Sequence, residues 1–251
     1  MKLKVMSLNI WRGEVLAAAL TFLGQEQPDI LLLQEVTNGS NPDLEPRYRL
    51  REVLQAALGG RYTHFFSRTA LNVSSMEKIE EGNAIFTTLP ILNTKTVFFS
   101  GKYGEYVDIP PNFPLCPRNL QHITLEVGEE SLHVINFHGV WDLDGSNASP
   151  ARQKMVAAVM SETTDPGHYI IGGDTNAEAD NPAMQPLETT FHNVFGRERT
   201  TSFNMRRTTN PAYGHVAVDM FYISPGITVL SHASPDVDIS DHLPMLLTVE
   251  L

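Results

Sequence analysis

The sequence predicts one α/β domain over residues 1–251, in which strands outnumber helices and a few helices cover layered sheets. Three observations indicate this class. Short segments rich in β-branched and aromatic residues recur along the chain, bounded by Gly, Pro, Asn or Asp. Fewer stretches have a helical period. No internal repeat, low-complexity run or linker divides the chain, so we expect a single layered unit.

Nine segments are expected to be strands. In chain order they are LKVMSLN (3–9), DILLLQEV (29–36), NAIFTT (83–88), HITLEV (122–127), LHVINFH (132–138), HYIIGGD (168–174), VDMFYIS (218–224), ITVLSH (227–232) and MLLTVEL (245–251). The fourth and fifth alternate clearly between apolar and polar residues. In the fifth, Leu132, Val134 and Asn136 share one face because side chains two apart in a strand point the same way.

Three segments have a helical pattern. Residues 14–25 carry an apolar stripe at helical spacing that ends near Gly24 and Pro28. Residues 47–58 stop at a pair of glycines. Residues 150–162 follow Ser149 as N-cap and begin with Pro150, the arrangement that favours a helix start.

Three further regions are expected to be irregular. Residues 68–83 and 101–118 are long, polar or Pro-rich, and the second contains several aromatic residues. Residues 197–207 (RERTTSFNMRR) form the densest basic patch of the chain. Long loops in a compact domain are commonly functional, although a solvated loop is an equally good explanation for each.

Composition limits the function classes. The net charge of −11 disfavours tight binding to duplex DNA, because the phosphate backbone is also negative. The same acidic charge is compatible with divalent-metal binding. No apolar run has the length of a membrane span, and the N-terminus lacks a signal-peptide pattern, so we expect a cytoplasmic protein without stable membrane association, acting as a monomer. The single cysteine, Cys116, excludes an internal disulfide and a Cys-rich zinc site.

Polar residues that a buried core would not select stand at the ends of the expected strands or close to them. Taken singly, each has an ordinary explanation: a turn asparagine, a surface glutamate, a hydrogen-bonded core histidine or a buried aspartate that accepts from the backbone. Their recurrence at strand ends indicates a functional cluster. They are Asn9, Glu35, His138, Asp174, Asn176, Asp219, Asp241 and His242.

The residue types in this cluster suit metal-assisted chemistry. Asp174 and Asn176 are two apart, so in an extended backbone both reach one atom, such as a water. Glu35, Asp241 and Asn9 offer hard oxygen ligands, which Mg²⁺ or Mn²⁺ prefers, whereas zinc requires more His or Cys. Neither a G-x-S-x-G nucleophile motif nor a P-loop is present.

Seven motifs in order resemble the signature series of the endonuclease/exonuclease/phosphatase superfamily, which has the deoxyribonuclease I-like fold. They are SLNIW, LLLQEV, GNAIFTTLPI, INFH, GGDTNAEAD, VDMFYIS and ISDH, and they span residues 7–242. The resemblance implies a four-layer αββα sandwich, with two mixed β-sheets packed face to face, helices outside and an active site at one end of the sheets. It also implies hydrolysis of a phosphoester by in-line attack of water, without a covalent enzyme intermediate.

Roles for individual residues follow from the resemblance. Glu35 is implied to be the main Mg²⁺ or Mn²⁺ ligand, and Asn9 and Asp241 to help hold the metal or the phosphate. Asp174, assisted by Asn176, is implied to orient or deprotonate the attacking water.

The remaining roles concern the phosphate. His242 is implied to donate to a phosphate oxygen or to transfer a proton, with Asp219 holding its tautomer. His138 resembles the second histidine of the deoxyribonuclease and sphingomyelinase branches, and Arg118 resembles an arginine on the phosphate side.

The chain departs from individual branches of the superfamily. Trp11 stands where the abasic-site endonuclease branch places an aspartate, so a second carboxylate on the metal side is missing. GDTN is similar to the tyrosyl-DNA phosphodiesterase branch, but the following AEAD is not.

These mixed affinities leave three interpretations open. The first is a phosphodiesterase or nuclease, for which residues 197–207 would contact nucleic acid. The second is a phosphatase or phosphodiesterase for a small-molecule or lipid headgroup. The third, least favoured, is a non-catalytic binding module that kept the fold. In the first two the expected partner is a phosphoester substrate.

Overall fold

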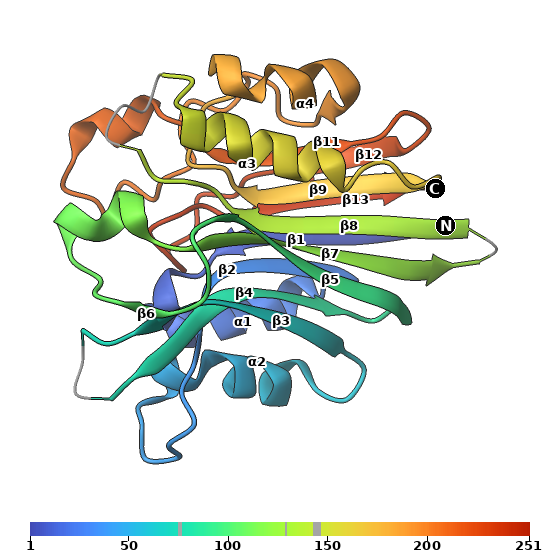
Figure 1. Ribbon diagram of the computed structural model, residues 1–251. Coiled ribbons are helices and arrows are strands. Elements are labelled where there is room, and N and C mark those ends of the chain that lie inside the picture. Colours follow the sequence, from blue (N-terminus) through green and yellow to red (C-terminus); the bar gives the residue numbers. More distant parts are fainter. Residues whose placement is uncertain (75–76, 129, 143–146) are drawn as a thin grey trace.

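Two β-sheets pack face to face and helices cover both outer faces in the computed structural model, which describes residues 1–74, 77–128, 130–142 and 147–251 (Figure 1). The helices α1 (Leu16–Glu26) and α2 (Leu50–Leu58) lie on the opposite side of the sheets from α3 (Pro150–Ser161) and α4 (Gln185–Thr190). The four-layer αββα sandwich implied by the sequence is confirmed.

The first sheet, called sheet A, has seven strands in the order β12-β13-β1-β2-β4-β3-β6. β1 and β2 are parallel, with Asn9 opposite Gln34, so both strands end at the same edge of the sheet. The strands are β1 (Lys2–Asn9), β2 (Ile30–Asn38), β3 (Thr63–Asn72), β4 (Ile79–Thr87), β6 (Glu105–Tyr106), β12 (Thr228–Ala233) and β13 (Met245–Glu250).

The second sheet, called sheet B, has six strands in the order β10-β11-β9-β8-β7-β5. β8 is parallel to β9 and β11 is antiparallel to it, which places His138, Asp174 and Asp219 in one row across the sheet. The strands are β5 (Ile91–Ser100), β7 (Arg118–Val127), β8 (Glu130–His138), β9 (His168–Asp174), β10 (His192–Asn193) and β11 (Asp219–Ile223).

Three apolar cores hold the layers together. The central core contains Leu32 of sheet A and Val134 of sheet B, both fully buried between the sheets. A second core packs Met155 of α3 against the outer face of sheet B, and a third packs Phe22 of α1 against the outer face of sheet A. Burial of such side chains contributes about 1.5–3 kcal/mol each.

A buried amide links the two sheets within the central core. The Asn136 side-chain nitrogen on β8 lies 3.0 Å from the Leu33 carbonyl oxygen and 3.2 Å from that of Ala84, both in sheet A. It also lies 2.9 Å from Gln121 Oε1. Gln34 Nε2 of sheet A donates back to Asn136 Oδ1 at 2.7 Å. The asparagine expected on the apolar face of this strand therefore has partners for its polar atoms.

The two glycines before Asp174 allow close approach of neighbouring strands. Gly173 has φ +140°, and a Cβ built on it would lie 2.0 Å from the carbonyl oxygen of Phe137 on β8. A Cβ on Gly172 would lie 2.6 Å from the ring of Phe221 on β11. The strand that carries Asp174 is thus packed too closely for any side chain at either position.

The nine expected strands and three expected helices are all present, with small shifts at their ends. The Ser149 side chain accepts from the backbone N–H of Arg152, as expected of an N-cap. Short 3₁₀ helices in the described ranges connect these elements: η1 (Trp11–Gly13), η2 (Pro46–Arg49), η3 (Pro110–Leu115), η4 (Pro182–Met184) and η5 (Pro211–His215). No helix in the described ranges is long and apolar enough to cross a membrane.

The expectation for residues 68–83 was wrong. Residues 68–72 belong to β3 and residues 79–83 to β4, which pair antiparallel, while residues 75–76 lie outside the described ranges. The segment is polar because β3 leaves many side chains partly or fully exposed and β4 leaves Glu80 and Glu81 partly exposed. β5, β6, β10 and α4 were also not expected from the sequence.

Candidate active site

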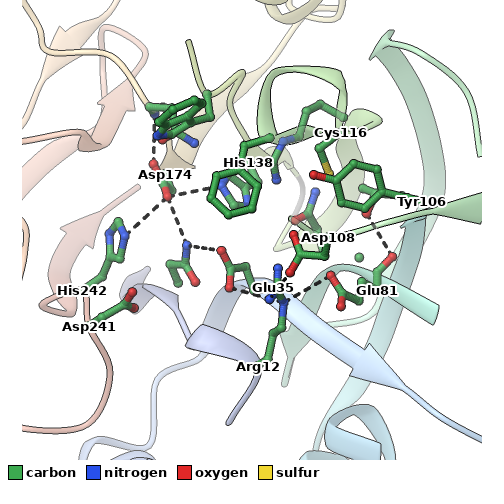
Figure 2. Close-up of a pocket in the computed structure, with 18 of the residues that line it drawn as sticks. Arg12, Glu35, Glu81, Tyr106, Asp108, Cys116, His138, Asp174, Asp241 and His242 are labelled. Carbon is green, nitrogen blue, oxygen red and sulfur yellow. Dashed lines mark hydrogen bonds and ion pairs between the residues drawn. The ribbon is translucent and has the colours of Figure 1, made fainter. Parts of the chain in front are cut away.

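One cavity of about 240 Å³ opens where strand ends of both sheets meet (Figure 2). Eight of the nine site residues expected from the sequence line it, and Asp219 is the exception because it lies behind His242. The eight are Asn9, Glu35, Arg118, His138, Asp174, Asn176, Asp241 and His242.

Glu35 reaches the cavity from a β-bulge in β2. The pairing of β2 with β4 shifts between Leu33 and Val36, and Glu35 has φ +57°. A left-handed backbone is unusual for a glutamate, and bulges commonly redirect a side chain at a functional site. The bulge explains how a residue in a buried strand points its carboxylate into the cavity (Figure 2).

Asn9 lies between two carboxylates. Its Nδ2 donates to Glu35 Oε1 at 3.2 Å and to Asp174 Oδ2 at 3.1 Å. Its Oδ1 accepts from the Trp11 backbone N–H at 3.1 Å. Asn9 therefore presents its side-chain nitrogen, and not its oxygen, to Glu35 and Asp174. These two hydrogen bonds connect the part of the site on sheet A with the part on sheet B.

Asp174 is buried at the centre of the cluster. Its Oδ1 accepts from the Asn176 backbone N–H at 2.9 Å, in a turn where Asn176 has φ +49°. Its Oδ2 lies 3.4 Å from His138 Nε2. Burial raises the pKa of Asp174 to about 6; His242 opposes this rise and Asp219 adds to it. A carboxylate with such a pKa can accept a proton near neutral pH.

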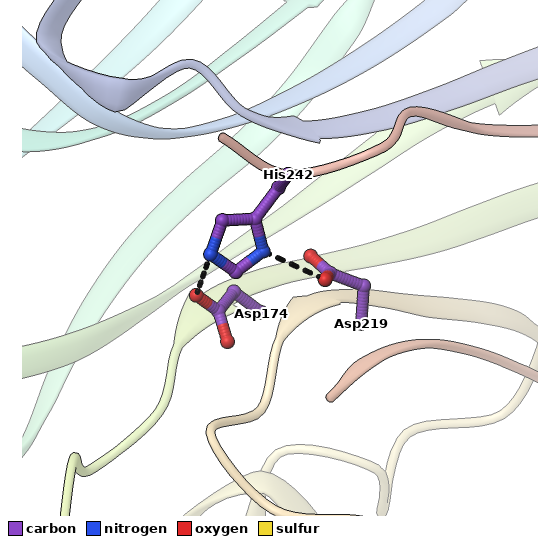
Figure 3. Close-up of side chains that lie close together, drawn as sticks. All are labelled: Asp174, Asp219 and His242. Carbon is purple, nitrogen blue, oxygen red and sulfur yellow. Dashed lines mark hydrogen bonds and ion pairs between the residues drawn. The ribbon is translucent and has the colours of Figure 1, made fainter. Parts of the chain in front are cut away.

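The two histidines have opposite electrostatic surroundings. For His242, burial alone would lower the pKa, but the carboxylates of Asp219 and Asp174 raise it well above its ordinary value. His242 Nδ1 lies 2.8 Å from Asp219 Oδ2, and its Nε2 lies 3.8 Å from Asp174 Oδ2 (Figure 3). For His138, burial and the positive charges of Arg118 and His242 lower the pKa well below that value. One histidine is therefore cationic and the other neutral at neutral pH.

Aromatic side chains form part of the cavity wall on two sides. The Phe203 ring lies 4.6 Å from the ring of His242 and stacks on Tyr213 at 4.4 Å. Phe113 and Trp141 meet edge to face at 5.7 Å. Both pairs line the cavity. Phe113 and Phe203 come from segments expected to be irregular, Trp141 follows an expected strand, and Tyr213 lies in η5.

Arg118 lines the cavity at the first position of β7. Its Nε is buried and has no hydrogen-bond partner among the described residues. An unpaired buried donor is costly, and an anionic ligand would satisfy it. This geometry fits the expected position beside a phosphate.

The carboxylates of Glu35 and Asp241 fit a divalent cation. Burial raises the pKa of Asp241 to about 6, with a further rise from Glu35 and an opposing effect of His242. A hard cation between two like charges would relieve this repulsion. Asp174, Asp219 and His242 also bring one ligand atom each within 4.8 Å of one another. Because His242 already hydrogen-bonds to Asp219, the oxygen-rich set around Glu35 suits Mg²⁺ or Mn²⁺ better.

Several cavity residues were not found from the sequence. Arg12 makes ion pairs with Glu81 and Asp108, and Tyr106 and Cys116 lie side by side at the far end of the cavity (Figure 2). Burial raises the pKa of Cys116, so the thiol is a poor nucleophile. Arg12 directly follows the motif SLNIW (7–11), and this position is the sequence signal that could have indicated it.

The arginines of residues 197–207 are largely occupied. Arg206 makes a two-point ion pair with Asp236, at 2.6 and 2.8 Å. Arg207 does the same with Asp238, at 2.7 and 2.6 Å. Arg199 donates to the Asp219 backbone carbonyl at 2.9 Å. The basic patch thus carries less free positive charge than its sequence suggests.

Comparisons with known proteins identify the family and the fold of the chain. The model of the Endonuclease/Exonuclease/phosphatase family matches residues 6–242. No curated protein matches the chain. Among solved structures, an endonuclease/exonuclease/phosphatase from Beutenbergia cavernae is 17% identical with TM-score 0.75, and 100% of this chain and 72% of that chain are covered.

Two similar structures have more specific names. TDP2 from D. rerio, complexed with a single-strand DNA product, is 19% identical with TM-score 0.70, and 100% of this chain and 99% of that chain are covered. A mannosyl-6-phosphatase from Bacteroides thetaiotaomicron is 15% identical with TM-score 0.72, covering 99% and 100%. Identities this low show a shared fold, while the family model spans most of the sequence. The chain belongs to the endonuclease/exonuclease/phosphatase family, whose members hydrolyse phosphoesters.

Proposed function

We propose that this protein hydrolyses a small phosphoester with the help of one divalent cation, Mg²⁺ or Mn²⁺. The observation that carries the proposal is the convergence of a carboxylate pair, a proton acceptor and an imidazolium on one cavity. Glu35 and Asp241 supply the pair, Asp174 the acceptor and His242 the imidazolium. The family to which the chain belongs makes phosphoester hydrolysis the reaction that this set serves.

The cation would be held by Glu35 and Asp241. When bound, it would neutralise charge on the phosphate oxygens as the phosphorus is attacked. Asn9 keeps Glu35 and Asp174 in place through the two hydrogen bonds of its amide. Its oxygen would reach the ion only if the amide turned away from the Trp11 N–H.

The chain's own residues carry the proton transfers. Asp174 accepts a proton from the attacking water, and the Asn176 backbone N–H fixes the direction of its carboxylate. His242 donates from Nε2 to a phosphate oxygen, while Asp219 holds the proton on Nδ1.

Two further residues bind the phosphate. Arg118 offers its unpaired Nε–H together with a permanent positive charge. Neutral His138 lies beside Asp174 and can donate to, or accept from, an oxygen of the substrate.

Three features support a small substrate over a long polynucleotide. The cavity is about 240 Å³ in volume. The net charge is −11, which repels a polyphosphate. The basic loop has Arg206 and Arg207 in ion pairs with aspartates. A phosphatase is among the similar structures.

A nuclease acting on short single strands is the second candidate. The aromatic pairs at the cavity wall favour it, because bases stack on aromatic rings. The similar TDP2 structure holds a single-strand DNA product.

A hydrolysis panel tests the proposal. Small phosphomonoesters, small diesters and short oligonucleotides are each incubated with Mg²⁺, with Mn²⁺ and with chelator. We expect turnover of small esters that requires metal. Glu35→Gln should remove most activity and be partly rescued by more metal, whereas Glu52→Gln on the exposed face of α2 should act like the wild type. Full activity in excess chelator would refute the metal role.

A further inference from the structure

Three carboxylates surround one guanidinium beside the candidate metal site. Arg12 Nη1 lies 2.6 Å from Asp108 Oδ2, and its Nε lies 3.2 Å from Glu81 Oε2 and 3.9 Å from Glu35 Oε2. The carboxylates come from β2, β4 and the loop after β6, so distant parts of the chain converge on Arg12 (Figure 2).

The backbone that carries Arg12 is held in an unusual conformation. Trp11 and Arg12 each have φ +48°, and Gly13 has φ +71°. Left-handed backbone is unfavourable for residues with a Cβ and persists where surrounding contacts require it. The Trp11 N–H is fixed by Asn9 Oδ1. The turn therefore directs the Arg12 side chain toward the carboxylates.

Arg12 is essential to the charge balance of this part of the cavity. The Glu81 side chain is 12% exposed and that of Asp108 is 13% exposed. Burial raises the pKa of Glu81, Arg12 and a hydrogen bond from Asn72 oppose the rise, and Glu35 adds to it. Without a cation near them, these carboxylates would repel one another.

We propose that the Arg12 guanidinium occupies the place of a second cation, so that the active site takes one divalent ion. The inference rests on the proposed function, in which Glu35 binds that ion. It agrees with the sequence, because Trp11 stands where the abasic-site endonuclease branch places an aspartate, so a second metal-side carboxylate is missing here. Glu81 and Asp108 bind a fixed positive charge from the chain, and Glu35 is left to share its other oxygen with the ion.

Metal stoichiometry tests the inference directly. Isothermal titration calorimetry with Mn²⁺ is carried out on the wild type, Arg12→Ala, Arg12→Gln and Arg206→Ala. We expect the wild type to bind one ion. Arg12→Ala and Arg12→Gln should bind two ions, or bind one at least about tenfold more tightly, because a positive charge a few ångströms from the ion is removed. Arg206→Ala changes the net charge equally at an exposed ion pair and should match the wild type.

A second substitution separates this effect from general loosening of the fold. Glu81→Gln added to Arg12→Gln removes one of the released carboxylates and should return binding to that of the wild type. Thermal melting establishes that each variant is folded, and Arg12→Gln keeps a long polar side chain should Arg12→Ala fail to fold.

The outcomes distinguish the two proposals. One ion in the wild type, with the same stoichiometry and affinity in both Arg12 variants, overturns the inference and leaves the proposed function intact. Two ions in the wild type also overturn it. No ion in the wild type refutes the metal role in the proposed function itself.

Discussion

His242 Nδ1 lies 2.8 Å from Asp219 Oδ2, and both side chains are buried, with His242 in the cavity wall and Asp219 behind it. The contact joins the chain before β13 to the first residue of β11. With Nδ1 against the Asp219 carboxylate, Nε2 on the other side of the ring faces Asp174 and the cavity (Figure 3). Asp219 thus fixes the orientation of the imidazole without lining the cavity itself.

Asp219→Asn should lower turnover by about a hundredfold, within the range of positioned acid–base groups, while KM changes little. The amide keeps the shape of the side chain but removes the charge that stabilises the imidazolium. Steady-state kinetics on a small phosphoester measures the effect. The ¹⁵N chemical shifts of His242 should report a fall in its pKa.

Asp238→Asn is the matched control for Asp219→Asn. Asp238 also accepts hydrogen bonds, but at the surface from Arg207 and Asn204. It should leave turnover and the His242 shifts unchanged. Wild-type turnover in Asp219→Asn would show that Asp219 serves folding alone.

Gly173→Ala should destabilise the protein by about 3 kcal/mol, since a crowded methyl group and a disfavoured backbone conformation both add to the strain. The new Cβ would lie 2.0 Å from the Phe137 carbonyl oxygen and would force β9 away from β8. Urea unfolding gives the free energy. Gly196→Ala is the control, because φ is +51° there but nothing lies within 4 Å of the added Cβ. Equal losses in the two variants would contradict the steric argument.

Replacing Arg206 and Arg207 by alanine should have almost no effect on hydrolysis or on the salt dependence of oligonucleotide binding. Both guanidiniums are already paired with aspartates. If they gripped a polynucleotide, each lost contact would lower the salt slope by about one unit. Binding of a labelled single strand is titrated with salt, and Arg118→Ala serves as the variant expected to lose activity. If the slope of binding affinity against salt concentration fell by about two units in the double alanine variant, the result would support the polynucleotide interpretation.

The contribution of His122 to the stability of the fold should be lost as the pH falls from about 7 to 5. His122 Nε2 lies 3.0 Å from His133 Nδ1, and its Nδ1 lies 3.3 Å from Glu162 Oε2. Burial lowers the pKa of His122, Glu162 and Asp165 oppose this, and His133 adds to it. On acidification, His122 therefore takes up a proton in the unfolded chain before it does so in the folded protein. Its contribution to the free energy of unfolding is complete above the pKa of the unfolded chain, and it is lost as the pH falls through the pKa of the folded protein.

Glu162 also contributes stability that is lost on acidification, at a lower pH than His122. Burial alone would raise its pKa, but hydrogen bonds from Lys95 and His122 lower it, so its contribution is also lost on acidification. Urea unfolding at several pH values measures the slope. His122→Gln should lower the slope of stability against pH between pH 7 and 5, whereas the exposed His192→Gln should leave this slope unchanged. An unchanged slope in His122→Gln would show that other groups cause the acid sensitivity.

The sequence predicted those elements whose own residues encode them. Strands with dense apolar residues, such as the one before Glu35, were found because both faces are buried. β5 was missed because most of its side chains are partly or fully exposed. β6 and β10 have two residues each and exist only through pairing with a neighbour. Their formation depends on tertiary contacts that no local pattern reveals.

The site was predictable only in part. Polar residues at the ends of buried strands could be read from the sequence, and eight of the nine line one cavity. Arg12 and Glu81 were not found, because an arginine in a turn and a glutamate in a polar strand look like ordinary surface residues. Their significance lies in an ion pair between segments far apart in the chain. The bulge at Glu35 likewise depends on the register of β2 with β4.

The amide of Asn136, buried between the sheets, has a mechanical consequence for the active site. The active site lies at the boundary between the two sheets, called the seam here. Asn9 and Glu35 belong to sheet A, while His138 and Asp174 belong to sheet B. Apolar contacts are non-directional and would let one sheet slide along the other, but hydrogen bonds lock the offset. A shear of one ångström would misalign the two halves long before the protein unfolded, so alignment across the seam is itself a requirement for activity.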